Sequence, residues 1–188
     1  MGQSIRAKAL DDRLGVAILI ELLKNAPSNI NLLAAFTVQE ELGLRGAKIA
    51  AHTLDPDLAL AIDSTPAFDL PMHDDRENIR YNTKLGGGPA IYTVDRGTLS
   101  DPRIIRWLSE TGDKENIPYQ YRQPGGGGTD AGAIHISRAG IPTGSVSVPG
   151  RYAHTAMGLC RIRDWENTLN LLHAALCNLT PKLLEKPR

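Results

Sequence analysis

The sequence predicts a single α/β layer sandwich, because segments typical of buried strands alternate along it with amphipathic helical segments. A second observation is the length, since 188 residues suffice for one core that buries roughly 70% of the unfolded chain's surface. We therefore expect one domain in which helices cover a sheet.

The first half of the chain predicts strands separated by helices. Asp11 and Asp12 cap a helix whose apolar side chains recur at helical spacing, namely Val16, Leu19, Ile20 and Leu23. Residues 30–38 are apolar on both alternating faces, which predicts a central strand covered on both sides. Residues 46–53 are short and rich in alanine, and 58–62 predict a second buried strand. The expected order is therefore strand, helix, strand.

The second half is less regular. Residues 64–88 are polar, and we expect a long surface connection with short strands. The remaining predicted elements are helices over 101–111, 129–138 and 163–179, and strands over 119–122 and 144–148. The tail from Pro181 is expected to fray.

Composition excludes several classes of function. The 21 basic residues balance 21 acidic ones, and no basic run supplies the footprint of a nucleic-acid-binding protein. Two cysteines cannot form a disulfide framework, and the polar N-terminal segment does not resemble a signal peptide, so the cytoplasm is the expected location. No apolar run approaches the roughly 20 residues that span a bilayer, so a membrane role is not expected.

Candidate functional residues follow the predicted strands. In open α/β sheets ligands bind beyond the carboxyl ends of strands. The first strand runs into Glu40 and Glu41, the second into Asp63, and the third leads toward His154. Asp11 begins the first helix. Carboxylate and imidazole groups suit Zn, Mn or Co, and a divalent cation would offset repulsion between the carboxylates, so the sequence predicts a metal site.

Each feature also has a simpler interpretation. The aspartate pair before a helix is often only an N-cap, and the glutamate pair could be a solvated strand end. His154 could simply satisfy a turn. The glycine run 125–128 lacks the Lys-Ser/Thr of a P-loop, which leaves two alternatives: a loop whose backbone approaches a substrate, or a plain loop.

Five motifs carry a family resemblance. They are ALDDRLG (9–15), TVQEELGLRGA (37–47), AID (61–63), GGTDA (127–131) and RYAHT (151–155). In this order they resemble the M42 family of metallo-aminopeptidases, which includes the tetrahedral aminopeptidases and proteins labelled glucanase homologues. The resemblance implies a three-layer sandwich with a mixed, mostly parallel central sheet flanked by helices. It also implies hydrolysis of N-terminal residues from peptides.

The resemblance further implies two divalent metal ions per active site, with Zn, Co and Mn as candidates. Asp11 matches the bridging aspartate, and Glu41 and His154 match the other ligands of one ion. Asp63 matches a ligand of the second ion, and Glu40 matches the general base. The aminopeptidase reaction would then depend on these five side chains.

Further residues match the substrate side of the family's site. Arg13 would orient carboxylates, and Gly128, Thr129 and Asp130 would line the substrate. The peptide substrate is the expected small partner, and no nucleic acid or membrane partner is expected.

The chain departs from the family pattern at its start. The family's first metal-binding histidine and a small inserted β-rich domain lie upstream of the Asp-Asp-Arg motif, whereas only ten residues precede Asp11 here. We therefore expect residues 1–188 to form a partial catalytic domain that lacks the N-terminal strands. One metal site would be fully liganded, and activity would be impaired. Exposed apolar faces would favour a homo-oligomer or pairing with a separate N-terminal segment.

Two other functions remain alternatives at this point. A non-catalytic or split fragment could bind one metal ion or a peptide and act in assembly. A glycosidase is disfavoured, because its two carboxyl groups must face each other across roughly 5–9.5 Å, which the adjacent Glu40 and Glu41 cannot do.

Overall fold

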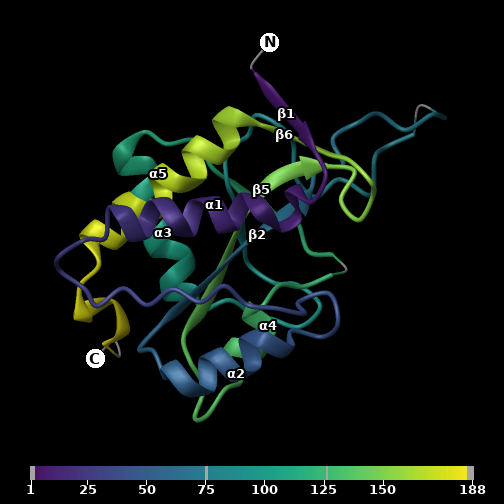
Figure 1. The fold of residues 1–188 in the computed structure, drawn as a ribbon. Helices are drawn as coiled ribbons and strands as arrows, with labels where there is room; N and C mark the ends of the chain where they lie inside the picture. The colour runs from purple at the N-terminus through teal and green to yellow at the C-terminus, as the bar shows by residue number, and fades with distance from the viewer. Residues whose placement is uncertain (1–2, 75, 126, 186–188) are drawn as a thin grey trace.

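The computed structural model describes residues 3–74, 76–125 and 127–185, and it shows a mixed sheet packed between helices (Figure 1). The six strands are β1 (Ser4–Ala7), β2 (Ala59–Pro66), β3 (Ala90–Tyr92), β4 (Gln120–Arg122), β5 (Thr143–Arg151) and β6 (Gly158–Arg161). The α-helices are α1 (Leu10–Lys24), α2 (Arg45–Leu54), α3 (Pro102–Glu115), α4 (Ala131–Ile134) and α5 (Ile162–Asn178). A 3₁₀ turn, Pro181–Leu184, follows α5.

Strand β5 is the centre of the sheet. On one side β2 runs parallel to it, from Ala59 opposite Thr143 to Pro66 opposite Gly150. On the other side β3 and β6 pair antiparallel with different parts of β5, β4 extends β3 in parallel, and β1 pairs antiparallel with β6. The longest pairing is thus the parallel one between β2 and β5. Because these two strands are parallel, their carboxyl ends lie at the same edge.

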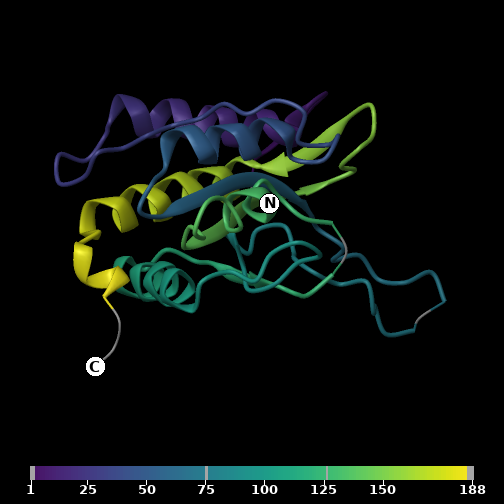
Figure 2. The same ribbon diagram turned by 90° about the horizontal axis from the view of Figure 1, so that it is seen from below.

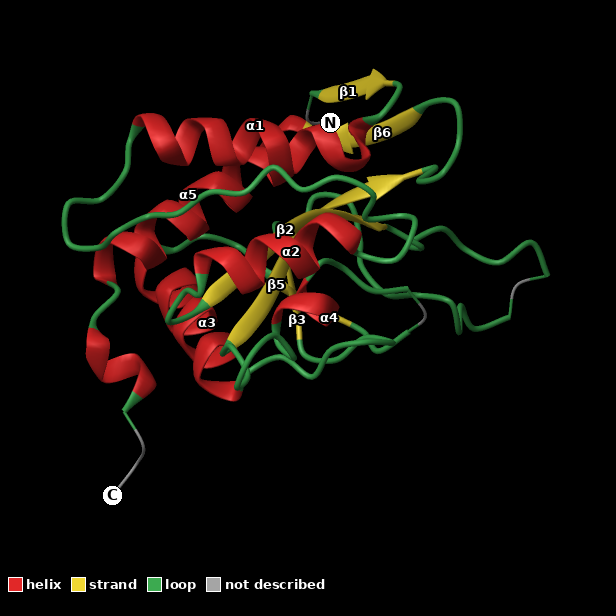
Figure 3. Ribbon diagram, turned by 60° about the horizontal axis from the view of Figure 1, so that its bottom comes forward, coloured by secondary structure: helices red, strands yellow, loops and turns green. Residues whose placement is uncertain are grey.

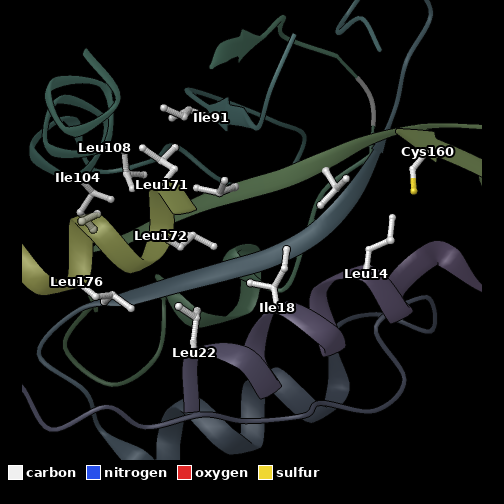
Figure 4. Packing of buried hydrophobic residues seen from close by; sticks show 13 residues of the cluster. Leu14, Ile18, Leu22, Ile91, Ile104, Leu108, Cys160, Leu171, Leu172 and Leu176 are labelled. Carbon is white, nitrogen blue, oxygen red and sulfur yellow. The ribbon is translucent and has the colours of Figure 1, made fainter. Parts of the chain in front are cut away.

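The helices cover both faces, as the sequence predicts. Figure 2 shows α1 and α2 on one side of β2 and α3 on the other, while α5 packs against both α1 and α3. In Figure 4 the α1 side chains Ile18 and Leu22 lie on one side of β2, and Leu171 of α5 lies on the other. Each such fully buried aliphatic side chain contributes roughly 1.5–3 kcal/mol to folding. The α/β sandwich is therefore confirmed.

Most predicted helices and strands are present, and local chemistry explains where they begin. The carboxylate of Asp101, at the N-cap of α3, accepts a hydrogen bond from the backbone N–H of Arg103 at 2.9 Å, and Pro102 occupies the first helical position. The predicted helix over 46–53 is α2, and the one over 163–179 is α5. No helix among the described residues is both long enough and apolar enough to cross a bilayer.

The predicted strand over 30–38 is wrong, because these residues carry no strand assignment. Figure 3 shows them as a loop that runs between α1 and α2. Ile30 and Leu32 do pack against the core, but Phe36 and Val38 are exposed. Apolar alternation reports a tendency to burial, whereas a strand also requires a neighbour that takes its backbone hydrogen bonds.

Other differences concern short elements. Residues 67–89, apart from the undescribed residue 75, contain no strand and form a long arm that projects from the sheet (Figure 1). The helix expected over 129–138 is reduced to the four residues of α4. Strands β1, β3 and β6 were not predicted, whereas the equally short β4 lies within the predicted strand over 119–122. Three or four residues give only a weak periodic signal. The predicted frayed tail is a 3₁₀ turn as far as the description extends, to residue 185.

Candidate metal centre

Three side chains from separate parts of the chain converge at the edge where β2 and β5 end. Asp11, Glu41 and His154 each offer a ligand atom, and these atoms all lie within 4.8 Å of one another. His154 Nε2 lies 3.5 Å from Asp11 Oδ2 and 3.1 Å from Glu41 Oε1. The set therefore combines two carboxylates and an imidazole, as the sequence analysis expected.

Asp11 owes its position to the distorted start of α1. Asp11 and Asp12 have non-helical backbone angles, so regular helix begins after them. Asp12 Oδ1 accepts a hydrogen bond from Gly15 N at 2.9 Å, which makes Asp12 the helix cap. A Cβ atom at position 15 would lie 2.3 Å from Asp12 Oδ2, so any larger residue there would displace the capping carboxylate. The prediction that aspartate caps this helix is confirmed, and the cap leaves Asp11 outside the helix.

Glu41 and His154 lie on turns with left-handed backbone. Gln39 and Leu44 on either side of the glutamates have φ values of 60° and 56°, and Tyr152 and His154 have 63° and 57°. Such conformations cost roughly 1–2 kcal/mol for residues other than glycine. They persist where surrounding contacts fix the backbone, which is common at functional sites.

Asp63 lies beside this group but is not one of the three converging ligands. It lies inside β2, in the half of the strand nearer its carboxyl end, and Ser64 N donates a hydrogen bond to Asp63 Oδ1 at 2.7 Å. Burial, followed by the negative charges of Asp12 and Asp11, raises the pKa of Asp63 well above its usual range. The carboxylates thus repel one another across a small space, which a bound cation would relieve.

The two adjacent glutamates have different surroundings. Glu41 is exposed and contacts His154, whereas Glu40 is half-buried. Burial, followed by the charges of Asp130, Glu41 and Asp11, raises the pKa of Glu40 to about 7. A carboxylate with this pKa can both accept and release a proton near neutral pH.

Two acidic residues belong to the site in ways that the sequence analysis did not identify. Burial, followed by the charges of Asp11, Asp130 and Glu40, raises the pKa of Asp12 to about 8, even though its bond from Gly15 lowers that pKa. Asp130, expected to contact substrate, accepts a hydrogen bond from the Thr37 hydroxyl, and its buried Oδ1 has no hydrogen-bond partner within the described residues. In the sequence, the adjacent Asp11 and Asp12 were the feature that could have indicated this larger acidic cluster.

The other predicted substrate residues do not converge on the three ligands. Thr129 is buried, and its hydroxyl donates to Ser145 Oγ at 3.1 Å. Gly128 is exposed beside Asp95, and Arg13 is exposed without an ion pair in the part of the chain that the structure describes. Of the glycine run 125–128, residue 126 lies outside the described residues. Substrate roles for these residues stay predictions.

The three converging ligands open onto a cavity of about 100 Å³. Its wall combines these polar groups with Leu10, Leu14 and other apolar residues. Carboxylate oxygen and imidazole nitrogen are the ligands that Zn, Mn and Co accept. The donor chemistry and the mutual repulsion of the carboxylates therefore both fit a divalent cation.

Comparison with known proteins agrees with this chemistry. The M42 glutamyl aminopeptidase family matches residues 1–171. A protein of Acetivibrio thermocellus that carries an aminopeptidase name is 40% identical over 177 residues, which are 94% of this chain and 52% of that protein. The glutamyl aminopeptidase of Lactococcus lactis is 34% identical over 190 residues, or 98% of this chain and 51% of its own.

Solved structures give the same result. The aminopeptidase APDkam598 from the archaeon Desulfurococcus kamchatkensis superposes with a TM-score of 0.87 at 37% identity, covering 96% of this chain and 51% of that one. The Pyrococcus horikoshii TET1 peptidase, described as assembling into a tetrahedron or a large octahedral shell, has a TM-score of 0.74 at 33% identity, with 94% and 51% covered. The chain spans about half the length of the relatives it matches. By sequence and fold together, it belongs to the M42 peptidase family.

Proposed function

We propose that residues 1–188 form part of the catalytic domain of a metal-dependent aminopeptidase, which removes N-terminal residues from peptides. The observation that carries the proposal is the convergence of Asp11, Glu41 and His154 from three separate segments of an M42 chain. A packing role would not require two carboxylates and an imidazole to share one small space.

In this proposal Asp11, Glu41 and His154 would hold one divalent ion. Asp63, together with Asp11 as a bridge, would contribute to a second, less completely liganded site; the raised pKa of Asp63 beside Asp11 supports this placement. When bound, Zn, Co or Mn would polarise the scissile carbonyl and favour ionisation of the attacking water.

Glu40 would act as the general base. Its pKa of about 7 suits a group that takes a proton from the attacking water and then passes it to the leaving amine. Glu41 differs because it is exposed and beside His154, which suits a ligand. The different surroundings of the two glutamates thus support a role as general base for one and as metal ligand for the other.

Substrate would enter from the side of Asp130, Gly128 and Arg13. A segment with glycine allows a peptide backbone to approach closely. Because the Thr129 hydroxyl bonds to Ser145, its contribution would come from its backbone.

Self-association and a cytoplasmic location also belong to the proposal. Exposed apolar side chains gather on α1 and on residues 30–38, namely Val16, Ile20, Leu23, Leu33, Phe36 and Val38. Such side chains favour association with a second copy or with a separate N-terminal segment.

The test combines metal content with hydrolysis of aminoacyl p-nitroanilides by the metal-loaded chain. We expect Glu40→Gln to reduce turnover at least about 100-fold, as loss of a general base does, while metal per chain stays unchanged. Glu110→Gln, on the exposed face of α3, is the matched control. It should keep both the turnover and the metal content of the parent chain. Normal turnover of Glu40→Gln would refute the base assignment. Metal binding without any turnover would instead favour a non-catalytic fragment.

A further inference from the structure

We propose that Arg151 and Asp69 form an ion pair whose role is to position His154 at the candidate metal centre. This inference rests on the proposed function, because it assumes that His154 binds metal. Neither residue is among the ligands, the base or the substrate residues described above. Both are positioning residues, since they act through the backbone of the loop that carries His154.

The need for such positioning arises from the imidazole itself. A metal-binding histidine normally donates its other ring N–H to a carboxylate or carbonyl, which fixes the orientation of the ring. Within the described residues His154 Nδ1 has no such partner, and the side chain is 70% exposed. The location of the ring therefore depends on the path of the backbone that carries it.

That path begins at Arg151, the last residue of β5. Tyr152 and His154 both have left-handed backbone, so the chain turns sharply within three residues of the strand. The Thr155 hydroxyl donates to Tyr152 O at 2.7 Å and closes the turn. A shift at Arg151 would therefore be transmitted directly to His154.

The Arg151 guanidinium is firmly held by Asp69. Its Nε and Nη2 lie 3.1 Å and 2.7 Å from the same oxygen, Asp69 Oδ1. The two side chains are only 24% and 15% exposed, so solvent screens the pair less than a typical surface ion pair. The other oxygen, Asp69 Oδ2, accepts a hydrogen bond from Leu85 N at 3.1 Å. Both oxygens of one carboxylate thus connect the end of β5 to the segment around Leu85.

The segment around Leu85 is in turn anchored to helix α5. Asp164 is fully buried, and its two oxygens accept hydrogen bonds from Gly86 N at 2.7 Å and Gly88 N at 3.0 Å. Gly88 has a φ of +80°, and a Cβ there would lie 2.0 Å from Pro118 O. A continuous set of contacts therefore runs from the core helix α5 through this glycine turn and Asp69 to Arg151.

The experiment measures Zn²⁺ affinity of the whole 188-residue chain by competition with a chromogenic chelator. We expect Arg151→Gln and Asp69→Asn each to weaken binding about 10–100-fold, the usual effect of removing a partner that orients a ligand. The double variant should be no weaker than either single variant, because both changes break one interaction. Arg151→Lys should recover part of the affinity.

The chain offers a matched control in another ion pair. Arg103 Nη2 lies 2.7 Å from Asp101 Oδ2, and the side chains are 33% and 17% exposed. This pair is at the other end of β5, because Asp101 N bonds to Thr143 O. Arg103→Gln should therefore leave Zn²⁺ affinity within about twofold of the parent.

The outcomes separate this inference from the proposed function. If His154→Ala binds Zn²⁺ as well as the parent chain does, the metal site itself is wrong. If His154→Ala loses binding but Arg151→Gln and Asp69→Asn do not, only the positioning role is refuted. Circular dichroism at the assay temperature measures the folded fraction. A loss of affinity that merely follows loss of folded protein would also overturn the positioning role. The absorption spectrum of bound Co²⁺ should change in Arg151→Gln but not in Arg103→Gln.

Discussion

Replacing Asp164 with alanine should destabilise the protein. The change removes the acceptor for two backbone N–H groups, Gly86 N at 2.7 Å and Gly88 N at 3.0 Å. Gly88 is buried, and a buried donor left without a partner costs about 1–3 kcal/mol of unfolding free energy, whereas Gly86 is exposed and water can replace its lost partner. Burial raises the pKa of Asp164, so keeping this carboxylate ionised in the native state carries a cost. The net loss at neutral pH should lie toward the lower end.

Urea unfolding followed by circular dichroism measures this loss. Asp164→Asn retains one acceptor oxygen, so its unfolding free energy should fall by about half as much as that of the alanine variant. This variant keeps the test usable if Asp164→Ala does not fold. Because the native pKa is raised, the contribution of Asp164 is fully present below its unfolded pKa and declines as pH rises through the native pKa. The loss should therefore be larger near pH 4 than at pH 7. Asp113→Ala, at an exposed hydrogen bond, is the control. A loss below about 0.5 kcal/mol for Asp164→Ala would refute the anchoring role of this carboxylate.

Three further predictions concern stability. Gly88→Ala should cost more than Gly127→Ala in urea unfolding, because the two glycines have similar φ values of +80° and +84° but, among the described residues, only a Cβ at position 88 would meet another atom. Equal costs would contradict the reasoning. Asp101→Ala should cost about 1 kcal/mol at pH 7 by removing the α3 cap. Hydrogen bonding to Arg103 lowers the pKa of Asp101, so the stability that Asp101 contributes is present above pH about 3.9 and is lost as pH falls through the lower native pKa. A stability difference between parent and variant that does not change with pH would argue against this contribution. Zn²⁺ at 100 times its dissociation constant should stabilise the chain by about 2.7 kcal/mol in thermal unfolding, and His154→Ala should abolish this gain; a gain kept by the variant would point to another site.

The sequence predicts correctly those helices whose spacing or capping residues are local features. The helix spacing of α1 and α5 and the Asp-Pro start of α3 are local features, and the structure has all three helices. Residues 30–38 have an equally clear apolar pattern, but a strand there depends on a neighbouring strand elsewhere in the chain. Strands β1 and β6 are the opposite case, because they form by pairing with each other although neither has a pattern of its own.

The types of ligand in the candidate site could be predicted from the sequence, but the contacts that hold them in place could not. Glu41 and His154 follow predicted strands, Asp11 begins the first predicted helix, and the three side chains converge in the structure. The sequence also predicted the cap, but the membership of Asp12 in the acidic cluster depends on the kinked start of α1, which the sequence does not show. The contact between Arg151 and Asp69 joins residues far apart in the sequence, and no local sequence pattern predicts it.

The wide separation of the three ligands along the chain has a consequence for observing how the protein folds. Asp11 lies at the distorted start of α1, and His154 follows the long strand β5, so the group exists only after these distant segments have been brought together on the sheet. Neither an isolated peptide nor a partly assembled intermediate would present it. The spectroscopic signal of Co²⁺ captured during refolding would therefore report when the complete ligand set forms, and would be insensitive to helices or strand pairs that form before it.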